Sequence, residues 1–531
     1  MKKVFKKIGV VLGITVCVLL FVSFVGFAYL FLVPNSSLLG IKYISNKSAK
    51  YYQLGEYDTA SKPINQLVIN TKNYNVKFVV DKDVNGLQVY MKNDVAGLVL
   101  KKDSAINLGY SYDNINKKLD ISTKEINGWI GYGSSYIEVI VPEDVIVANL
   151  VLKITVGSDS YIDVGGMSGT KIDTLNLTAG RGAINIDNIE MRALTINASK
   201  SKVVIGENIG NQIENVKLNV GNSSVNFLKS GGGEQEIVKA KNEKRAVNKD
   251  NVAFNIVKFE VVGMKKDGKI QFIKCDELSS AGYTENRISG GSIECVYVSK
   301  LIQFYTNNCS IKLNEIGGNV NSIYNADGSG NFNLVGVSNG DLTIHSSSGK
   351  IFVNQLLGVG DFKTNSGDIT IKNATKSLQL ISQKGDINVK FGEDVSEFLG
   401  DSSPYRRVSL LRVKNSRVNI SGLNVIKMVV ENGGNADVKL TYKKVLGDNT
   451  FDVNTGNLLA IVPKDCPLKI DVTGNDTMFN CQVGSATYPM AKLNANYNMT
   501  VYTQLTSVDG TLKIDAGRGT VSLYSDDLYG Q

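Results

Sequence analysis

Three stretches of the chain share one pattern: LTIHSSSGKIFV at 342–353, DFKTNSGDITI at 361–371 and LQLISQKGDINV at 378–389. In each stretch, apolar and polar residues alternate, a polar turn with a glycine interrupts the alternation, and the alternation then resumes. Alternation with a period of two is typical of β-strands that have one buried face. The turn glycines lie 18 residues apart (367 − 349 and 385 − 367). A repeat of this length without a helical segment predicts a β-solenoid, in which each strand–turn–strand coil stacks on the one before.

Burial gives the physical reason for stacking. One coil cannot bury its inward-facing residues alone, so we expect Ile369 and Ile371 to pack against Ile387 and Val389 of the next coil. We expect the Ser-Gly and Gly-Asp steps of the turns to supply positive φ angles, which glycine adopts without steric cost.

A second, longer repeat supports the same architecture. Residues 142–186 and 463–522 have related sequences. The first copy contains VPED, LKITVGSD and LNLTAGRGAINI in order, and the second contains VPKD, LKIDVTGND and LKIDAGRGTVSL. An internal repeat of this kind is typical of a protein that forms a long surface. The predicted class is all-β, with one or two parallel β-solenoid lobes.

The N-terminus carries a membrane signal. Four lysines, Lys2, Lys3, Lys6 and Lys7, precede an apolar run from Ile8 to Val33 that contains no charged residue. The run is long enough to cross a bilayer as a helix, and the lysines favour a cytoplasmic N-terminus. A cleaved signal peptide is the alternative, but its apolar core is typically about 7–15 residues long and ends at a small-x-small site. The sequence therefore favours an uncleaved signal-anchor in the plasma membrane, with the rest of the chain extracellular.

Changes in composition suggest a domain order. We expect a basic cytoplasmic tail at 1–7, a transmembrane helix at 8–33 and a polar, tyrosine-bearing stalk at 34–62. The first β-solenoid lobe is predicted at 63–230 and the second at 252–531. Between them, 231–251 combines three glycines with several lysines, which is typical of a linker or an insertion.

Composition excludes several classes. Hydrophobic residues at 43%, with 52 glycines and 7 prolines, indicate a chain that folds. The formal net charge is +8, and half of it belongs to the four N-terminal lysines, which leaves too little for a nucleic-acid-binding surface. Five of the six cysteines lie outside the apolar run, and an odd number argues against a complete disulfide framework. These five are Cys275, Cys295, Cys309, Cys466 and Cys481.

The repeated phrases resemble a known group of proteins. The SGDITI and KGDINV units, the opening LVINTKNYNVKF from Leu67 and the VPED step at Val141 are similar to bacterial adhesin-like β-solenoid families, including autotransporter-head adhesin-like repeats. The resemblance covers about 64–228 and 300–525. It implies a right-handed parallel β-helical body and a location at the cell surface or in the envelope. It supplies no catalytic residues.

One motif suggests a metal. Asp81, Asp83 and Asn85 match the first half of an EF-hand calcium loop, in which alternating oxygens converge on the ion. The twelfth position of such a loop is Lys92 instead of glutamate, and the flanks read as strands. A hairpin turn that uses the Asn-Gly step is the alternative. Calcium is therefore a weak candidate, and no other cofactor is expected.

Catalytic motifs are scarce. His345 is the only histidine, and the alternation places it on the face opposite Leu342 and Ile344, as a surface imidazole. Asp368 and Asp386 follow the glycines of successive units and could stack as the paired carboxylates of a solenoid glycosidase or lyase. Because Gly-Asp recurs at 340–341, turn chemistry is the favoured explanation. We expect no catalytic site.

Two further features suggest contacts. Trp129 and Tyr132 lie in NGWIGYG, where they could stack on a sugar ring or rest on lipid, although packing beneath the end of a lobe is the favoured alternative. Cys275 and Cys295 could occupy neighbouring coils, and Cys466 and Cys481 could bracket a strand–turn–strand unit. Both pairs are compatible with disulfides or with buried free thiols.

The sequence thus predicts a single-pass membrane protein, not an enzyme, that displays a β-solenoid for adhesion or for envelope organisation. The expected partners are the membrane and a cell-wall glycan or surface protein. One alternative is a membrane-tethered polysaccharide lyase or hydrolase, which would need a groove with converging carboxylates. Another is an accessory protein of an envelope-stress system.

Overall fold

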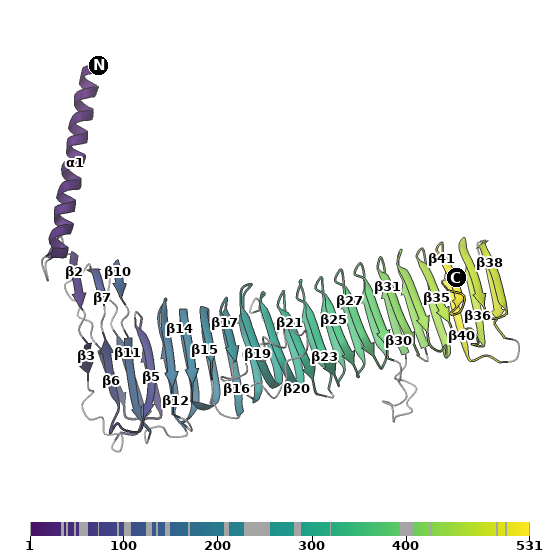
Figure 1. Cartoon of the computed structure of the whole chain (residues 1–531), viewed down its shortest axis with the longest axis horizontal. Coiled ribbons are helices and arrows are strands. Elements are labelled where there is room, and N and C mark those ends of the chain that lie inside the picture. Colours follow the sequence, from purple (N-terminus) through teal and green to yellow (C-terminus); the bar gives the residue numbers. More distant parts are fainter. Residues whose placement is uncertain are drawn as a thin grey trace. The chain divides into compact units, whose positions relative to one another are not determined.

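In the described residues, the protein is all-β apart from one N-terminal helix (Figure 1). The computed structural model describes residues 2–529 except 33–36, 39–40, 47–48, 53–61, 73, 93–94, 100–107, 124–129, 134–135, 144–148, 168–169, 207–211, 228–254, 281–287, 319, 393–407, 425–426, 495–496 and 505–506. The chain divides into two compact units, Met1–Val204 with Asn208–Gly210, and Ile205–Glu207 with Asn211–Gln531.

Helix α1 (Lys2–Leu32) begins the first unit. Its stretch Gly9–Tyr29 has a mean hydropathy of 2.8, and none of that stretch is buried by the rest of the protein. The helix is therefore long and apolar enough to cross a membrane.

The described residues of the first unit then continue mainly as strands. Its strands are β1 (Ser37–Leu38), β2 (Ile41–Asn46), β3 (Ala49–Tyr52), β4 (Gln66–Asn70), β5 (Asn75–Asp81), β6 (Gln88–Lys92), β7 (Val95–Val99), β8 (Leu108–Asp113), β9 (Lys118–Thr123), β10 (Ile130–Gly133), β11 (Tyr136–Pro142), β12 (Val151–Thr155), β13 (Ser160–Gly165), β14 (Lys171–Asp187) and β15 (Glu190–Ile205).

Parallel pairing dominates the body of the first unit. One ladder runs β11–β5–β13–β14 and another runs β9–β4–β12–β14, all parallel. The long strand β14 belongs to both ladders, through 174–178 and 182–187. Antiparallel strands close these ladders: β6 on β11, β3 on β6 and β8 on β9. Strands β1, β2, β7 and β10 form a separate antiparallel sheet.

The second unit consists of strands β16 to β41. They are β16 (Gln212–Gly221), β17 (Ser224–Phe227), β18 (Asn255–Met264), β19 (Lys269–Ser280), β20 (Ser292–Thr306), β21 (Ser310–Ile316), β22 (Ser322–Ala326), β23 (Phe332–Ser338), β24 (Leu342–Ser346), β25 (Ile351–Leu356), β26 (Gly360–Thr364), β27 (Ile369–Ala374), β28 (Leu378–Ser382), β29 (Ile387–Phe391), β30 (Val408–Val413), β31 (Arg417–Leu423), β32 (Lys427–Asn432), β33 (Asp437–Tyr442), β34 (Gly447–Asp452), β35 (Asn457–Val462), β36 (Leu468–Gly474), β37 (Thr477–Val483), β38 (Ala486–Leu493), β39 (Tyr497–Tyr502), β40 (Gly510–Ala516) and β41 (Thr520–Ser525).

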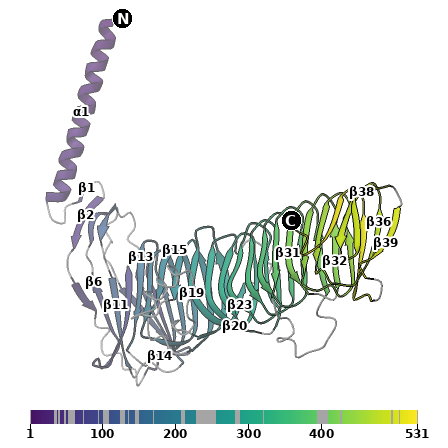
Figure 2. The same ribbon diagram turned by 45° about the vertical axis from the view of Figure 1, so that its right-hand side comes forward.

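Most of these strands form two parallel ladders, which lie side by side in Figures 1 and 2. One runs β20–β22–β24–β26–β28–β30–β32–β34–β40–β36, and the other runs β21–β23–β25–β27–β29–β31–β33–β35–β41–β37. Each strand pairs with the strand two further along the chain until β34 and β35. At this end the spatial order departs from the chain order. Strand β40 lies between β34 and β36, and strand β41 lies between β35 and β37.

The register confirms the expected apolar stacking. Ile369 lies opposite Ile387 and Ile371 opposite Val389, so each residue meets its equivalent 18 positions later. One inward row of the first ladder illustrates the core: Tyr324, Ile344, Phe362, Leu380, Leu411, Val430, Phe451, Ile514 and Val472. All of them are at most 2% exposed, so the neighbouring repeats bury one another.

The turn glycines act differently from the sequence expectation. Gly349, Gly367 and Gly385 are not among the residues with positive φ. Instead, a Cβ atom on each would overlap the carbonyl oxygen of the glycine one repeat earlier: Gly330, Gly349 and Gly367 respectively. The expectation of positive φ was wrong at these positions. Close approach of successive backbones is what requires glycine there.

The two copies of the longer repeat pair in the same way. In the first copy, Leu152 of β12 lies opposite Leu175 of β14, and 160–165 lies opposite 182–187. In the second, Ile470 of β36 lies opposite Leu512 of β40, and β37 lies opposite β41. The second copy differs by the added strands β38 and β39, which pair antiparallel with β37 and β36.

The sequence predicts two connecting segments, a stalk at 34–62 and a linker or insertion at 231–251. Of the stalk expected at 34–62, the strands β1, β2 and β3 pair within the first unit, with β2 on β7 and β3 on β6. The segment 231–251 lies outside the described residues. The strands that flank it pair directly, β16 with β18 and β17 with β19, which favours an insertion over a linker between lobes.

Substitution of Gly367 by alanine tests the close approach. The added methyl group must push adjacent repeats apart, so we expect a loss of stability of about 1–3 kcal/mol. Thermal and denaturant unfolding of the purified chain measures it. Gly433→Ala is the matched control, because a Cβ at Gly433 would meet only Val413 O, at 3.9 Å. Equal melting temperatures for the two variants would contradict this account of the turn glycines.

Candidate functional site

One row of outward-facing side chains crosses the first ladder of the second unit. Alternation along each strand puts these residues on the face opposite the core. In spatial order, the row is Tyr305, Asn325, His345, Lys363, Ile381, Arg412, Glu431, Asp452, Asp515 and Thr473. Its basic residues come first and its acidic residues follow. We call this set the outer row.

A shallow polar groove of about 250 Å³ lies beside the first part of the outer row. Strands β22, β24 and β26 each contribute their last two residues and the first residue of the following turn, at 325–327, 345–347 and 363–365. The middle residues are buried and small: Ala326, Ser346 and Thr364. These residues lie at the floor of the groove, and longer polar side chains stand on both sides of them.

The floor hydroxyl groups already have structural partners. Ser346 Oγ donates to Gly330 O at 2.7 Å and accepts from Gly349 N at 3.0 Å. Thr364 Oγ1 accepts from Gly367 N at 2.8 Å. These bonds hold the turns in place. Ligand contacts in this groove therefore depend on the flanking side chains.

His345 faces one side of this groove. The strand LTIHS buries Leu342 and Ile344 and leaves His345 partly exposed, which confirms its predicted position opposite the aliphatic residues. Its Nε2 atom lies 3.6 Å from Asp361 Oδ2, and the two side chains are 35% and 37% exposed. That distance is longer than a hydrogen bond, and His345 Nε2 is buried with no hydrogen-bond partner among the described residues. The imidazole thus has an acidic neighbour without being fixed by it.

The far part of the outer row stacks three carboxylates. Glu431 lies opposite Asp452, and Asp452 lies opposite Asp515. Arg412 Nε donates to Glu431 Oε2 at 2.6 Å, so the first carboxylate has a cationic partner. Burial raises the pKa of Asp452 above its ordinary value, and the charges of Asp515 and Glu431 raise it further. Asp452 and Asp515 are therefore carboxylates with different environments on neighbouring strands.

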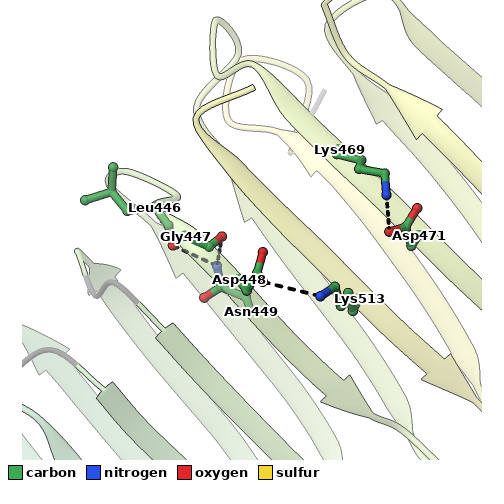
Figure 3. A network of polar contacts seen from close by, with 7 residues as sticks. All are labelled: Leu446, Gly447, Asp448, Asn449, Lys469, Asp471 and Lys513. Carbon is green, nitrogen blue, oxygen red and sulfur yellow. Dashed lines mark hydrogen bonds and ion pairs between the residues drawn. The ribbon is translucent and has the colours of Figure 1, made fainter. Parts of the chain in front are cut away.

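The adjacent outward row contains paired charges instead (Figure 3). Lys513 Nζ donates to Asp448 Oδ2 at 3.3 Å, and Lys469 Nζ donates to Asp471 Oδ2 at 2.8 Å. Asn449 Nδ2 donates to Leu446 O at 3.1 Å, which fixes the start of strand β34. These contacts are ordinary ion pairs of solvent-exposed side chains, which contribute little to stability.

Asp368 and Asp386 do stack, but both are engaged in turn structure. Asp368 Oδ1 accepts from Asp386 N at 3.2 Å, and Asp386 Oδ1 accepts from Arg417 N at 3.3 Å. Their second oxygens face cations: Lys350 Nζ lies 3.1 Å from Asp368, and an Arg417 nitrogen lies 3.6 Å from Asp386. The favoured explanation, turn chemistry, accounts for all of these contacts.

The calcium candidate has a local role in the structure. Asp81 ends β5, and its Oδ1 atom accepts from Asp83 N at 2.9 Å. The flanking segments are strands, as expected, but β5 and β6 do not form a hairpin. Both pair with β11, one on each side. The hairpin interpretation was wrong, because strand β11 takes the position between them. Calcium binding by Asp81, Asp83 and Asn85 stays a prediction, and elsewhere in the described ranges no group of three or more His, Cys, Asp or Glu could hold a metal ion.

Of the two residues of the predicted aromatic contact site, the structure describes only Tyr132. Trp129 lies outside the described residues. Tyr132 belongs to β10, where its backbone pairs with Ala96 of β7. Ligand binding by Trp129 and Tyr132 stays a prediction.

The five cysteines beyond helix α1 are buried free thiols. Cys275 in β19 and Cys295 in β20 do lie on paired strands, and Cys295 Sγ donates to Ile273 O at 3.2 Å. Burial raises the pKa of Cys275 well above its ordinary value. Protonated, buried thiols of this kind are poor nucleophiles.

Sequence reasoning missed the groove and the acidic end of the outer row. The groove could have been found from a small residue between two polar ones at the same position of successive repeats, as in Asn-Ala-Asp, His-Ser-Ser and Lys-Thr-Asn at 325–327, 345–347 and 363–365. No comparable sequence pattern predicts that Asp452 and Asp515 lie side by side. Asp515 is brought next to Asp452 because β40 returns between β34 and β36.

No protein-family model matches the chain, and no curated protein matches it. Among solved structures, the chain is similar to one described as a "putative cell adhesion protein" from Clostridium sporogenes ATCC 15579. The alignment covers 90% of this chain and 100% of that chain, at 7% identity and with a TM-score of 0.13. A score this low carries no argument about fold or function.

The raised pKa of Asp452 gives a testable dependence on pH. The folded state binds the Asp452 proton more tightly than the unfolded state, so ionisation of this group at neutral pH opposes folding. Asp452→Asn should therefore raise the melting temperature at pH 7, and the gain should shrink as the pH falls through the raised pKa towards 3.8. Melting curves between pH 7 and pH 3.5 measure it. A lower melting temperature for Asp452→Asn at pH 7 would show that the carboxylate stabilises the fold.

Proposed function

We propose that this chain is a membrane-anchored, adhesin-like scaffold that displays an extended β-solenoid surface for binding, without catalysis. The surface would face the outside of the cell or the envelope. Its binding partner would be a cell-wall glycan or a surface protein, and nucleic acid is not expected to bind.

The outer row is the observation that carries this proposal. It continues across ten neighbouring strands, from Tyr305 to Thr473, and nearly all of its members are polar or charged. Parallel stacking places equivalent side chains about 4.8 Å apart, which presents a regular array of binding groups to an extended polymer. The groove beside the outer row is shallow, so a long polymer can contact it without entering a deep pocket.

The solenoid architecture is supported by the parallel register. Ile351, Ile369 and Ile387 lie opposite one another on β25, β27 and β29, and similar ladders continue to β35. We propose a right-handed coil, the hand implied by the resemblance to bacterial adhesin-like β-solenoid families.

Helix α1 supports membrane anchorage. Its stretch Gly9–Tyr29 is apolar and uncovered, and lysines precede it. We propose a single-pass signal-anchor with the N-terminal lysines inside and all strands outside the plasma membrane.

One observation favours a second candidate, a membrane-tethered glycan-active enzyme. Asp452, with its raised pKa, stacks beside Asp515 on an exposed face. Glycoside hydrolysis needs two neighbouring carboxyl groups, one of which acts as general acid and the other as general base or nucleophile.

A binding and cleavage assay separates the two candidates. The full-length chain in detergent is applied to an array of cell-wall glycans and surface polymers, and release of products is scored in the same wells. We expect binding without cleavage. Asp452→Asn and Asp515→Asn should leave the wild-type result unchanged.

Cleavage that either of these variants abolishes would establish the enzyme and contradict the scaffold. If the chain neither binds nor cleaves any member of the array, the glycan partner is excluded and a protein partner should be sought by cross-linking on intact cells.

Topology is tested separately. The wild-type chain should sediment with membranes and should be cut by protease added to intact spheroplasts. A chain without residues 1–33 should not sediment with membranes. Protection of the strand region from external protease would contradict the proposed orientation.

A further inference from the structure

We infer that the groove formed by strands β22, β24 and β26 binds one acidic sugar unit, a saccharide ring that carries a carboxylate. This inference rests on the proposed function and names the ligand class of the display surface. Three features of the groove support it: the charge of Lys363, lining side chains without hydrogen-bond partners among the described residues, and the groove volume.

Lys363 supplies the positive charge. It stands exposed on β26, and among the described residues its ammonium group has no ion-pair partner. Some other outward cations are paired, for example Arg412 with Glu431 at 2.6 Å and Lys312 with Glu294 at 3.0 Å. The charge of Lys363 is therefore available to a ligand.

His345 lies beside Lys363 in the outer row, one strand away. The spacing of neighbouring strands is about 4.8 Å, so the two side chains can contact the two oxygens of one carboxylate. Asp361, two residues before Lys363 on β26, lies 3.6 Å from His345 Nε2. The Lys363 and His345 side of the groove is thus suited to an anion.

The opposite side of the groove is suited to hydroxyl groups. Asp327, Ser347 and Asn365 occupy equivalent positions in three successive turns. Their backbone groups bond to neighbouring turns, for example Asn365 N to Ser347 O at 3.0 Å, and in the described part of the chain their side chains have no hydrogen-bond partner. A carboxylate, a hydroxyl and an amide in a row can accept from and donate to the hydroxyls of a sugar.

The distribution of charge narrows the ligand class. Asp327 repels a ligand that is negative on all sides, such as a free phosphate ion, while Lys363 attracts a ligand that is negative at one end. The volume of about 250 Å³ is smaller than the usual range for drug-sized ligands, about 300–1,000 Å³, and suits a single ring. The lining has no Phe, Tyr or Trp side chain, which argues against a lipid or an aromatic ligand.

The test uses the full-length chain in detergent and two probes. One is a trisaccharide of galacturonic acid, and the other is the neutral galactose trisaccharide with the same linkages. Calorimetric titration should show binding of the acidic probe only. Lys363→Gln and His345→Gln should each weaken that binding at least about tenfold, as expected for the loss of one charged hydrogen bond.

The matched control is Lys390→Gln, which removes an equal charge from an exposed position on β29, outside the groove. It should bind like the wild type, and all variants should keep the wild-type melting temperature. Equal affinity for both probes, no binding of the acidic probe, or unchanged binding by Lys363→Gln and His345→Gln would overturn the inference. If binding to another polymer on the array persists in these cases, the scaffold function stands while the groove assignment fails. If the whole array is also silent, the groove assignment and the glycan partner both fail, and the scaffold function is left with a protein partner.

Discussion

Each strand–turn–strand repeat of the second unit can bury its inward side chains only against the repeats on either side. Phe362 is fully buried because Ile344 and Leu380 lie directly opposite it on the flanking strands. The in-register parallel hydrogen bonds that hold these strands also bring the turns so close together that a column of glycines is required. Register, turn composition and the spacing of the outward side chains all follow from this one requirement.

The same requirement creates a problem at the end of a stack, where the last repeat has an unpaired edge and an uncovered core. In the second unit, β38 and β39 pair antiparallel with the last parallel strands. Pro489 lies within β38, where it removes a hydrogen-bond donor and discourages a further strand. In the first unit, the antiparallel strands β6 and β8 close the ladders in a comparable way. Parallel strands thus build the body of each unit, and antiparallel strands end it.

Because the register is fixed by the core, the outward side chains become rows whose chemistry depends on residues far apart in the chain. The outer row collects basic residues near the groove and carboxylates at its other end. Ala326, Ser346 and Thr364 lie at the floor of the groove, and Lys363 lines it without an ion-pair partner in the described part of the chain. Asp368 and Asp386 also stack, yet their oxygens are taken up by backbone N–H groups and by cations. Stacking alone is therefore not enough to make a site.

The sequence by itself determined the all-β class, the apolar N-terminal helix and the pairing of Ile369 with Ile387, because alternation and an 18-residue period depend only on local order. It also placed His345 on the outward face. Only the tertiary structure decided that Gly367 serves close approach, that β11 separates β5 from β6, and that Asp515 lies beside Asp452. All three features depend on which strands pair with one another. That choice is set by long-range hydrogen bonding and core packing, which leave no local mark in the sequence.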